Sequence, residues 1–255
     1  MYRVFYKYMR SHWLKTLGNC RFLVSRPSKY WKDWSHSAPS DPAECLPTNN
    51  GGERFPLLER FSLSPAVFRE QFNKEFADPN TMDRIIRILC LSDPSKCVAT
   101  DLHMWEEYGA NFEGVRIGIQ LPIGDDGVCA SYREFRGEYV SYEATPNIIQ
   151  TRGILTHTEL SDKCFEVIFK KDRAKFSVES EFRLLTDCRH VKRDSGGLDF
   201  LQLENKMIFS VDVGYKMSKE NIKALFKLCK RNFSLNGFRK AMPHGALVEY
   251  TEVNL

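Results

Sequence analysis

The sequence lacks paired cysteines with the spacing that zinc sites and redox motifs use. Its eight cysteines are scattered, and several lie inside apolar runs, where a free thiol behaves as a small hydrophobic side chain. This usage predicts reduced thiols and a cytosolic protein. The amino-terminal stretch has no apolar core of a signal peptide, and no run reaches the roughly 18 apolar residues of a membrane-spanning helix. We therefore expect neither secretion nor membrane insertion.

Several common catalytic signatures are also missing. The sequence has no P-loop, no GxGxxG after a strand, no GxSxG and no HExxH, which removes the best-marked classes of nucleotide-binding proteins, hydrolases and metalloproteases. The net charge is +4 at pH 7, a mildly basic value that permits an acidic partner without requiring one.

The distribution of apolar residues predicts one α+β domain over residues 1–255. Its core is expected to be a mixed or antiparallel sheet flanked by helices, because strands and helices alternate without a regular βαβ rhythm. Residues 27–52 contain four prolines and an Asn-Asn-Gly-Gly sequence, which predicts a long loop. Near the carboxyl terminus, Ser218 is expected to cap a helix with Ile222 and Leu225 on its buried side.

The central stretch Leu102–Leu121 joins a helical turn to a strand. Trp105 and Tyr108 are three residues apart and so share a helical face, and Gly109 is placed as a helix stop. Val115 to Leu121 then alternate apolar with other residues, which is the period of a half-buried strand. Trp105, Tyr108 and Asn111 are candidates for lining a pocket, with the aromatic rings stacking on a base. The competing interpretation places Trp105 or Tyr108 in the core.

The sharpest chemical feature is Glu179-Ser180-Glu181, followed by Arg183. Phe176–Leu185 is predicted to be a strand, on which alternate residues point to the same side. Two carboxylates on one face repel each other, which tends to raise the pKa of one, and such a pair suits acid–base work or stabilisation of a cationic transition state. Arg183 is placed to offset the charge. A solvated strand face with a Glu–Arg pair is the alternative.

Taken in order, these segments resemble the bacterial family known as domain of unknown function 2971. The resemblance covers most of the chain and is carried by Tyr6-Lys7-Tyr8, Ser25-Arg26-Pro27-Ser28, the central stretch and the Glu-x-Glu-x-Arg sequence at 179–183. The order of a basic residue on the first strand, a middle aromatic and a late Glu-x-Glu is in turn similar to that of ADP-ribosyltransferases.

This resemblance implies an enzyme that consumes NAD and modifies nucleic acid or protein, as a toxin or phage-defence effector with a cognate inhibitor protein. Glu181 would be the catalytic carboxylate and Glu179 would assist attack by the acceptor. Tyr108 or Trp105 would stack on nicotinamide, and Lys7 or Arg10 would hold the NAD ribose or phosphate. The implied NAD-binding set is Lys7, Tyr8, Arg10, Ser25, Trp105, Tyr108, Asn111 and Arg183.

Two other functions fit the same sequence. Mild basicity and exposed aromatic residues are compatible with a non-enzymatic module that binds RNA or protein. Asp125 and Asp126, in a Gly-Asp-Asp-Gly turn, together with the glutamates would suit a metal-dependent nuclease.

Overall fold

The computed structural model describes residues 1–26, 86–124, 129–132, 135–143 and 169–253, so the expected loop at 27–52 lies outside the described residues. The chain divides into two compact units. The first comprises Met1–Val24, Ile88–Tyr139 and Val178–Leu255, and the second comprises Ser25–Arg87 and Val140–Ser177. The main sheet and the candidate site described below belong to the first unit.

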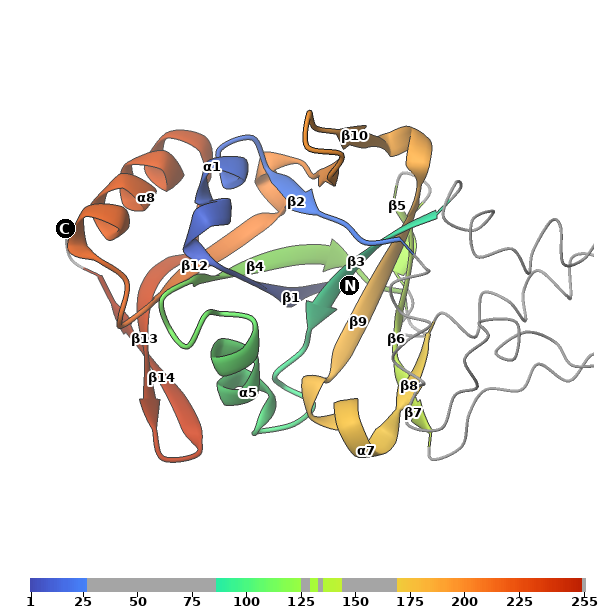
Figure 1. Cartoon of the computed structure of the whole chain (residues 1–255), viewed down its shortest axis with the longest axis horizontal. Helices are drawn as coiled ribbons and strands as arrows, with labels where there is room; N and C mark the ends of the chain where they lie inside the picture. Colours follow the sequence, from blue (N-terminus) through green and yellow to red (C-terminus); the bar gives the residue numbers. More distant parts are fainter. Residues whose placement is uncertain (27–85, 125–128, 133–134, 144–168, 254–255) are drawn as a thin grey trace, which may run out of the picture. The chain divides into compact units, whose positions relative to one another are not determined.

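The first unit is built on a nine-stranded mixed sheet, which confirms a sheet-dominated α+β architecture (Figure 1). Among the described pairings of this sheet, β12–β13 is parallel and the others are antiparallel. The strands in spatial order are β14 (Leu247–Glu252), β13 (Gly237–His244), β12 (Ile208–Gly214), β4 (Val115–Pro122), β1 (Tyr2–Met9), β3 (Ile86–Ser92), β9 (Glu181–Asp187), β6 (Phe135–Tyr139) and β5 (Cys129–Tyr132).

Strands β1 and β4 form the centre of the sheet, and the alternation of apolar residues predicted β4. Their register places Lys7 opposite Ile117 and Tyr8 opposite Arg116. The expectation that one face of β4 is solvated is wrong, because Arg116 and Gly118 are buried, as the isoleucines are. Both faces of the sheet are therefore covered here.

The two faces of the sheet carry different cores. Phe5 and Met9 of β1 pack into the larger apolar core together with Ile222 and Leu225 of α8 (Lys219–Asn232). Tyr8, on the opposite face of the same strand, packs with residues of α5 (Thr100–Glu107) in a smaller cluster. Helices α8 and α5 thus lie on opposite sides of the sheet, as Figure 1 shows.

The helix ends follow capping chemistry only in part. Ser218 caps α8 as expected, because its hydroxyl accepts a hydrogen bond of 3.2 Å from the Asn221 backbone amide. By contrast, the 3-10 turn η1 (Ser11–Trp13), which continues into α1 (Leu14–Leu17), has no side-chain hydrogen bond from its N-cap residue Arg10.

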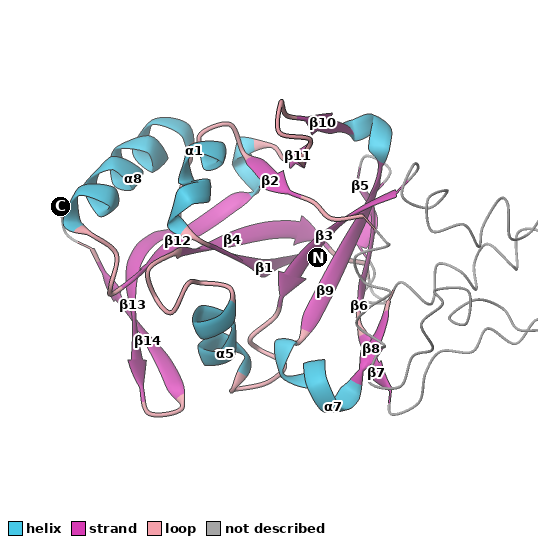
Figure 2. Ribbon diagram, viewed as in Figure 1, coloured by secondary structure: helices cyan, strands magenta, loops and turns pink. Residues whose placement is uncertain are grey.

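A three-stranded sheet completes the first unit (Figure 2). Its strand order is β10 (Val191–Arg193), β11 (Asp199–Gln202) and β2 (Arg21–Leu23), preceded by η7 (Cys188–His190), with η8 (Asn205–Met207) after β11. In the second unit, β7 (Ser141–Glu143) pairs in parallel with β8 (Lys170–Asp172), and α7 (Arg173–Phe176) follows.

The loop after α5 is held against β12 by backbone contacts. The amide of Gly214 donates to the Gly114 carbonyl at 3.0 Å, and the amide of Lys216 donates to the Phe112 carbonyl at 3.1 Å. A Cβ at Gly214 would lie 2.0 Å from the Phe112 carbonyl oxygen. Only glycine therefore allows the two backbones to approach this closely.

Gly109 is also explained by space. It follows the end of α5 directly after the C-cap residue Tyr108, as a helix stop should, but its φ is not positive, so the left-handed conformation is not the reason for glycine here. Instead, a Cβ there would lie 2.6 Å from the Trp105 ring. The missing side chain makes room for the tryptophan.

We predict that Gly214→Ala lowers the free energy of unfolding by about 1–3 kcal/mol, because the new methyl group meets backbone atoms that cannot move aside. The matched control is Gly196→Ala, whose Cβ would meet nothing closer than 3.4 Å and should change stability by less than about 0.5 kcal/mol. Urea unfolding measures both. Equal effects of the two substitutions would contradict the close approach.

Candidate functional site

Glu179 and Glu181 flank a sharp backbone turn, which we call the acidic turn (Glu179, Ser180 and Glu181). Glu179 ends the 3-10 turn η6 (Ser177–Glu179), and Glu181 begins β9. Ser180 between them has a φ of +44°, in the left-handed region that residues with a side chain rarely adopt. The expectation of one strand over 176–185 is therefore wrong at its beginning. Only Glu181 and Arg183 share a strand face.

The acidic turn is fixed by the start of α5. The Thr100 hydroxyl donates to the Val178 carbonyl at 2.6 Å and lies 2.9 Å from the Ser180 hydroxyl. The Ser180 carbonyl accepts from the Asp93 amide at 3.0 Å. A strained residue persists only where its surroundings over-determine it, and such residues cluster at functional sites.

The other end of α5 reaches Glu179. Tyr108, directly after the helix, donates its hydroxyl to a Glu179 carboxylate oxygen at 2.7 Å. Glu179 is 4% exposed, whereas Tyr108 is 43% exposed. Burial, followed by the Glu179 carboxylate, raises the pKa of Tyr108, so the phenol keeps its proton and remains a donor. A half-exposed aromatic ring thus lies against a buried acid.

Glu181 is held by an arginine. Its carboxylate accepts from Arg183 Nε at 2.9 Å and from Arg183 Nη2 at 3.2 Å, in a two-pronged ion pair. The two side chains are 4% and 1% exposed. The Glu–Arg pair of the alternative interpretation is therefore present and offsets the charge of Glu181, while its solvated strand face is wrong because both side chains are buried.

Lys7 approaches the same group of residues from β1. Its ammonium donates to the Cys90 carbonyl of β3 at 3.0 Å.

Burial, and next the nearby Glu181 carboxylate, raise the pKa of the Cys90 thiol to about 12. A neutral thiol is a poor nucleophile, so the chemistry of this site falls to the oxygen groups. Glu181 also contributes to the raised pKa of Tyr108. Residues from four segments of the chain therefore converge here.

Trp105, expected to stack on a ligand, is a core residue. Its side chain is 0% exposed, and its ring stacks on Phe112 with centroids 5.2 Å apart. The Tyr8 ring meets it edge-on at 5.6 Å. Trp105 and Tyr108 do not share an environment, because Tyr108 lies beyond the last helical residue. Of the two aromatic candidates, only Tyr108 can meet a ligand in this structure.

The remaining candidates have other surroundings. Tyr8 is buried and donates its hydroxyl to Asp101. Arg10 is exposed at the end of β1, and Asn111 is exposed in the loop after α5 with a φ of +50°. Ser25 belongs to the second unit.

The nuclease candidates Asp125 and Asp126 lie outside the described residues. Among the residues that the structure describes, no group of three or more His, Cys, Asp or Glu side chains could hold a metal ion.

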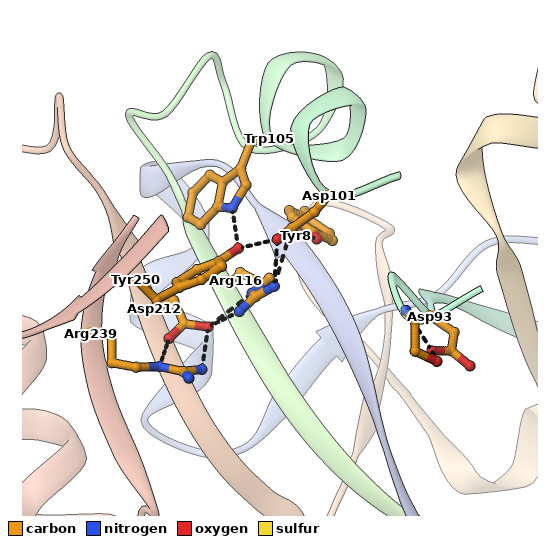
Figure 3. A network of polar contacts seen from close by, with 9 residues as sticks. Tyr8, Asp93, Asp101, Trp105, Arg116, Asp212, Arg239 and Tyr250 are labelled. Atoms are coloured by element: carbon orange, nitrogen blue, oxygen red, sulfur yellow. Dashed lines mark hydrogen bonds and ion pairs between the residues drawn. The ribbon is translucent and has the colours of Figure 1, made fainter. Parts of the chain in front are cut away.

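Sequence reasoning missed a buried ion network on the α5 face, which we call the Arg116 network (Figure 3). Arg116 pairs with Asp212 at 2.7 Å and with Asp101 at 3.0 Å. Arg239 also pairs with Asp212, at 2.7 Å. Because Asp212 is 0% exposed, these two guanidinium groups stabilise its ionised carboxylate in place of water.

Aromatic groups enclose the Arg116 network. The Tyr250 hydroxyl donates to Asp101 at 2.6 Å and accepts from the Trp105 indole nitrogen at 3.0 Å. The Arg116 guanidinium lies 3.9 Å from the Tyr250 ring centroid and 4.1 Å from that of Tyr6. Two acids and two arginines balance in charge, which is typical of a structural network. Its members are too far apart in sequence for any local pattern to join them.

A scan against protein-family models found no match to this chain, and searches of the curated proteins and of the solved structures found none either. Within the described residues, every helix is too short or too polar to traverse a lipid bilayer. Function must therefore be argued from the geometry of the site.

We predict that stability falls as pH rises above 10, the ordinary pKa of tyrosine, because burial raises the pKa of Tyr8 and of Tyr250. Above that pH the unfolded chain loses the two phenol protons while the folded state retains them. Each tyrosine then removes up to about 1.4 kcal/mol of stability per pH unit.

Urea unfolding across this pH range, with tyrosinate absorbance recorded in parallel, measures the effect. Tyr250→Phe removes one such group and should make the decline less steep. A free energy of unfolding that stays level above pH 10, or tyrosinate that appears at pH 10 from all tyrosines of the folded protein, would contradict the assignment.

Proposed function

We propose that this chain breaks the N-glycosidic bond of NAD and transfers ADP-ribose to an acceptor in nucleic acid or protein. The observation that carries the proposal is the contact at 2.7 Å between the half-exposed Tyr108 and the buried Glu179, beside a second buried acid, Glu181.

The reaction has one demand that such a site can meet. Nicotinamide leaves as a neutral ring with the electrons of the broken bond, and positive charge develops on the ribose carbon and ring oxygen. A fixed carboxylate stabilises this oxocarbenium-like centre. The acceptor then forms a new bond to the ribose carbon, and its proton passes to a carboxylate or to water.

We divide these roles between the two acids. Glu179 lies next to the exposed ring of Tyr108, so we assign to Glu179 the contact with the sugar and to Tyr108 the contact with nicotinamide. Glu181 is held in place by Arg183 and supplies a second carboxylate near Tyr108. We assign the contact with a ribose or phosphate oxygen to Lys7 of β1, whose ammonium lies at the Cys90 carbonyl.

The strand order supports the same proposal. The first strand β1 and the strand β9 that begins with Glu181 are separated in the sheet only by β3. A basic residue on the first strand, a middle aromatic and a late pair of acids are therefore close in space as well as ordered in sequence. In this order the chain resembles ADP-ribosyltransferases.

The test is release of nicotinamide from NAD by the purified chain. We expect Glu179→Gln to slow release about a hundredfold or more, because the amide cannot stabilise the cationic centre. Glu181→Gln should also slow it, through loss of the second negative charge. The control is Glu113→Gln, at an exposed position outside the acidic turn, which should leave release unchanged.

Thermal unfolding of each variant separates loss of reaction from loss of fold. Equal release by the unsubstituted chain and by a folded Glu179→Gln variant would contradict the proposal. Absence of release by the unsubstituted chain with single-stranded RNA, single-stranded DNA and protein acceptors would also contradict it.

A further inference from the structure

Helix α8 carries a dense positive charge on its exposed side. Its five cations and single acid give the helix a net charge of +4, equal to that of the whole chain, so the remaining residues balance to zero. Four of these cations follow the spacing i, i+4, i+7 and i+8 along one side and are exposed, namely Lys223, Lys227, Lys230 and Arg231.

The same side of α8 is hollowed. Lys223, Lys227, Lys230, Arg231 and the half-buried Phe226 line a surface hollow of about 550 Å³. The Phe226 ring is supported from below by Phe238, whose centroid is 5.1 Å away at an interplanar angle of 78°. We call this feature the α8 groove.

The four cations of the α8 groove have no charged partner among the described residues. Among the described residues, none of the four forms an ion pair or a hydrogen bond through its side chain. Four like charges within two turns repel one another, which destabilises the isolated helix. An external anion would relieve this repulsion.

We propose that the α8 groove binds the backbone of single-stranded nucleic acid, with Phe226 as a platform for a base. Lys223 and Lys227 are separated by one helical turn, about 6 Å along the axis, and Arg231 extends the row to about 12 Å. Such a row can follow successive phosphates of one strand. Basic grooves combined with aromatic platforms bind single strands with little sequence preference.

The structure favours a nucleic acid over an anionic membrane. A helix that binds a bilayer places its apolar face in the lipid. Here the apolar face, with Ile222, Leu225 and Cys229, is buried in the core of the first unit. Only the charged side and one supported ring are available to a partner.

The α8 groove lies on the side of the sheet opposite α5 and therefore away from the acidic turn. Binding at α8 does not rest on the proposed reaction of Glu179 and Glu181. If both proposals hold, the groove retains a nucleic acid whose reacting nucleotide is bound elsewhere on the molecule.

The experiment measures binding of a fluorescent oligothymidylate of about 16 nucleotides, at the upper end of single-strand site sizes. We expect the logarithm of affinity to fall with the logarithm of salt concentration with a slope of about −3, for four phosphate contacts. Lys223→Gln/Lys227→Gln should reduce the magnitude of this slope by about 1.4 and weaken binding about tenfold or more. Phe226→Leu keeps an apolar side chain, so it should weaken binding without changing the slope.

The matched control is Lys96→Gln/Lys192→Gln, which neutralises two exposed lysines outside α8 and should leave both affinity and slope close to those of the unsubstituted chain. Binding should also persist in Glu179→Gln, which separates this proposal from the NAD reaction. Equal weakening by the two double variants would overturn the assignment. Binding to phosphatidylserine vesicles in the absence of oligothymidylate binding would overturn it as well.

Discussion

The charge of Asp212 is the constraint on which the α5 side of the sheet depends. This carboxylate has no exposed surface, so its ionised form requires both Arg116 and Arg239 beside it. Loss of one partner from a buried pair of this kind costs about 3–5 kcal/mol, because an uncompensated charge remains inside. Arg116 in turn reaches Asp101, so the requirement extends from the sheet strands β12, β13 and β4 to helix α5.

Helix α5 transmits this constraint to the acidic turn. Asp101, at its beginning, is held by Arg116 and Tyr250, while the neighbouring Thr100 bonds to Val178. The far end of the helix carries Tyr108 to Glu179. The helix spans only eight residues, so its two ends bracket the turn within about 12 Å. A structural network on one set of strands thereby sets the geometry of the candidate site on another.

Elements with a strong local period could be predicted from sequence. Alternation located β4, and the Ser218 cap with its apolar stripe located α8. Strand β13 was missed because Pro243 and mixed polar residues argue against a central strand. The structure explains the exception, since pairing with β12 ends at Ala241 and only β14 accompanies Pro243. Glu179 and Glu181 could be singled out from the sequence, but their geometry depends on the positive φ of Ser180, which no sequence pattern predicts.

The central claim is that Asp101 anchors α5 and so positions Tyr108 at the acidic turn. Native-state hydrogen exchange of the amides in Thr100–Glu107, compared between the unsubstituted chain and Asp101→Asn, tests it most directly. Loss of the charged hydrogen bonds should accelerate exchange of α5 about tenfold to a hundredfold, while amides of β1 and β4 exchange as before. Unchanged exchange across α5 in Asp101→Asn would contradict the account.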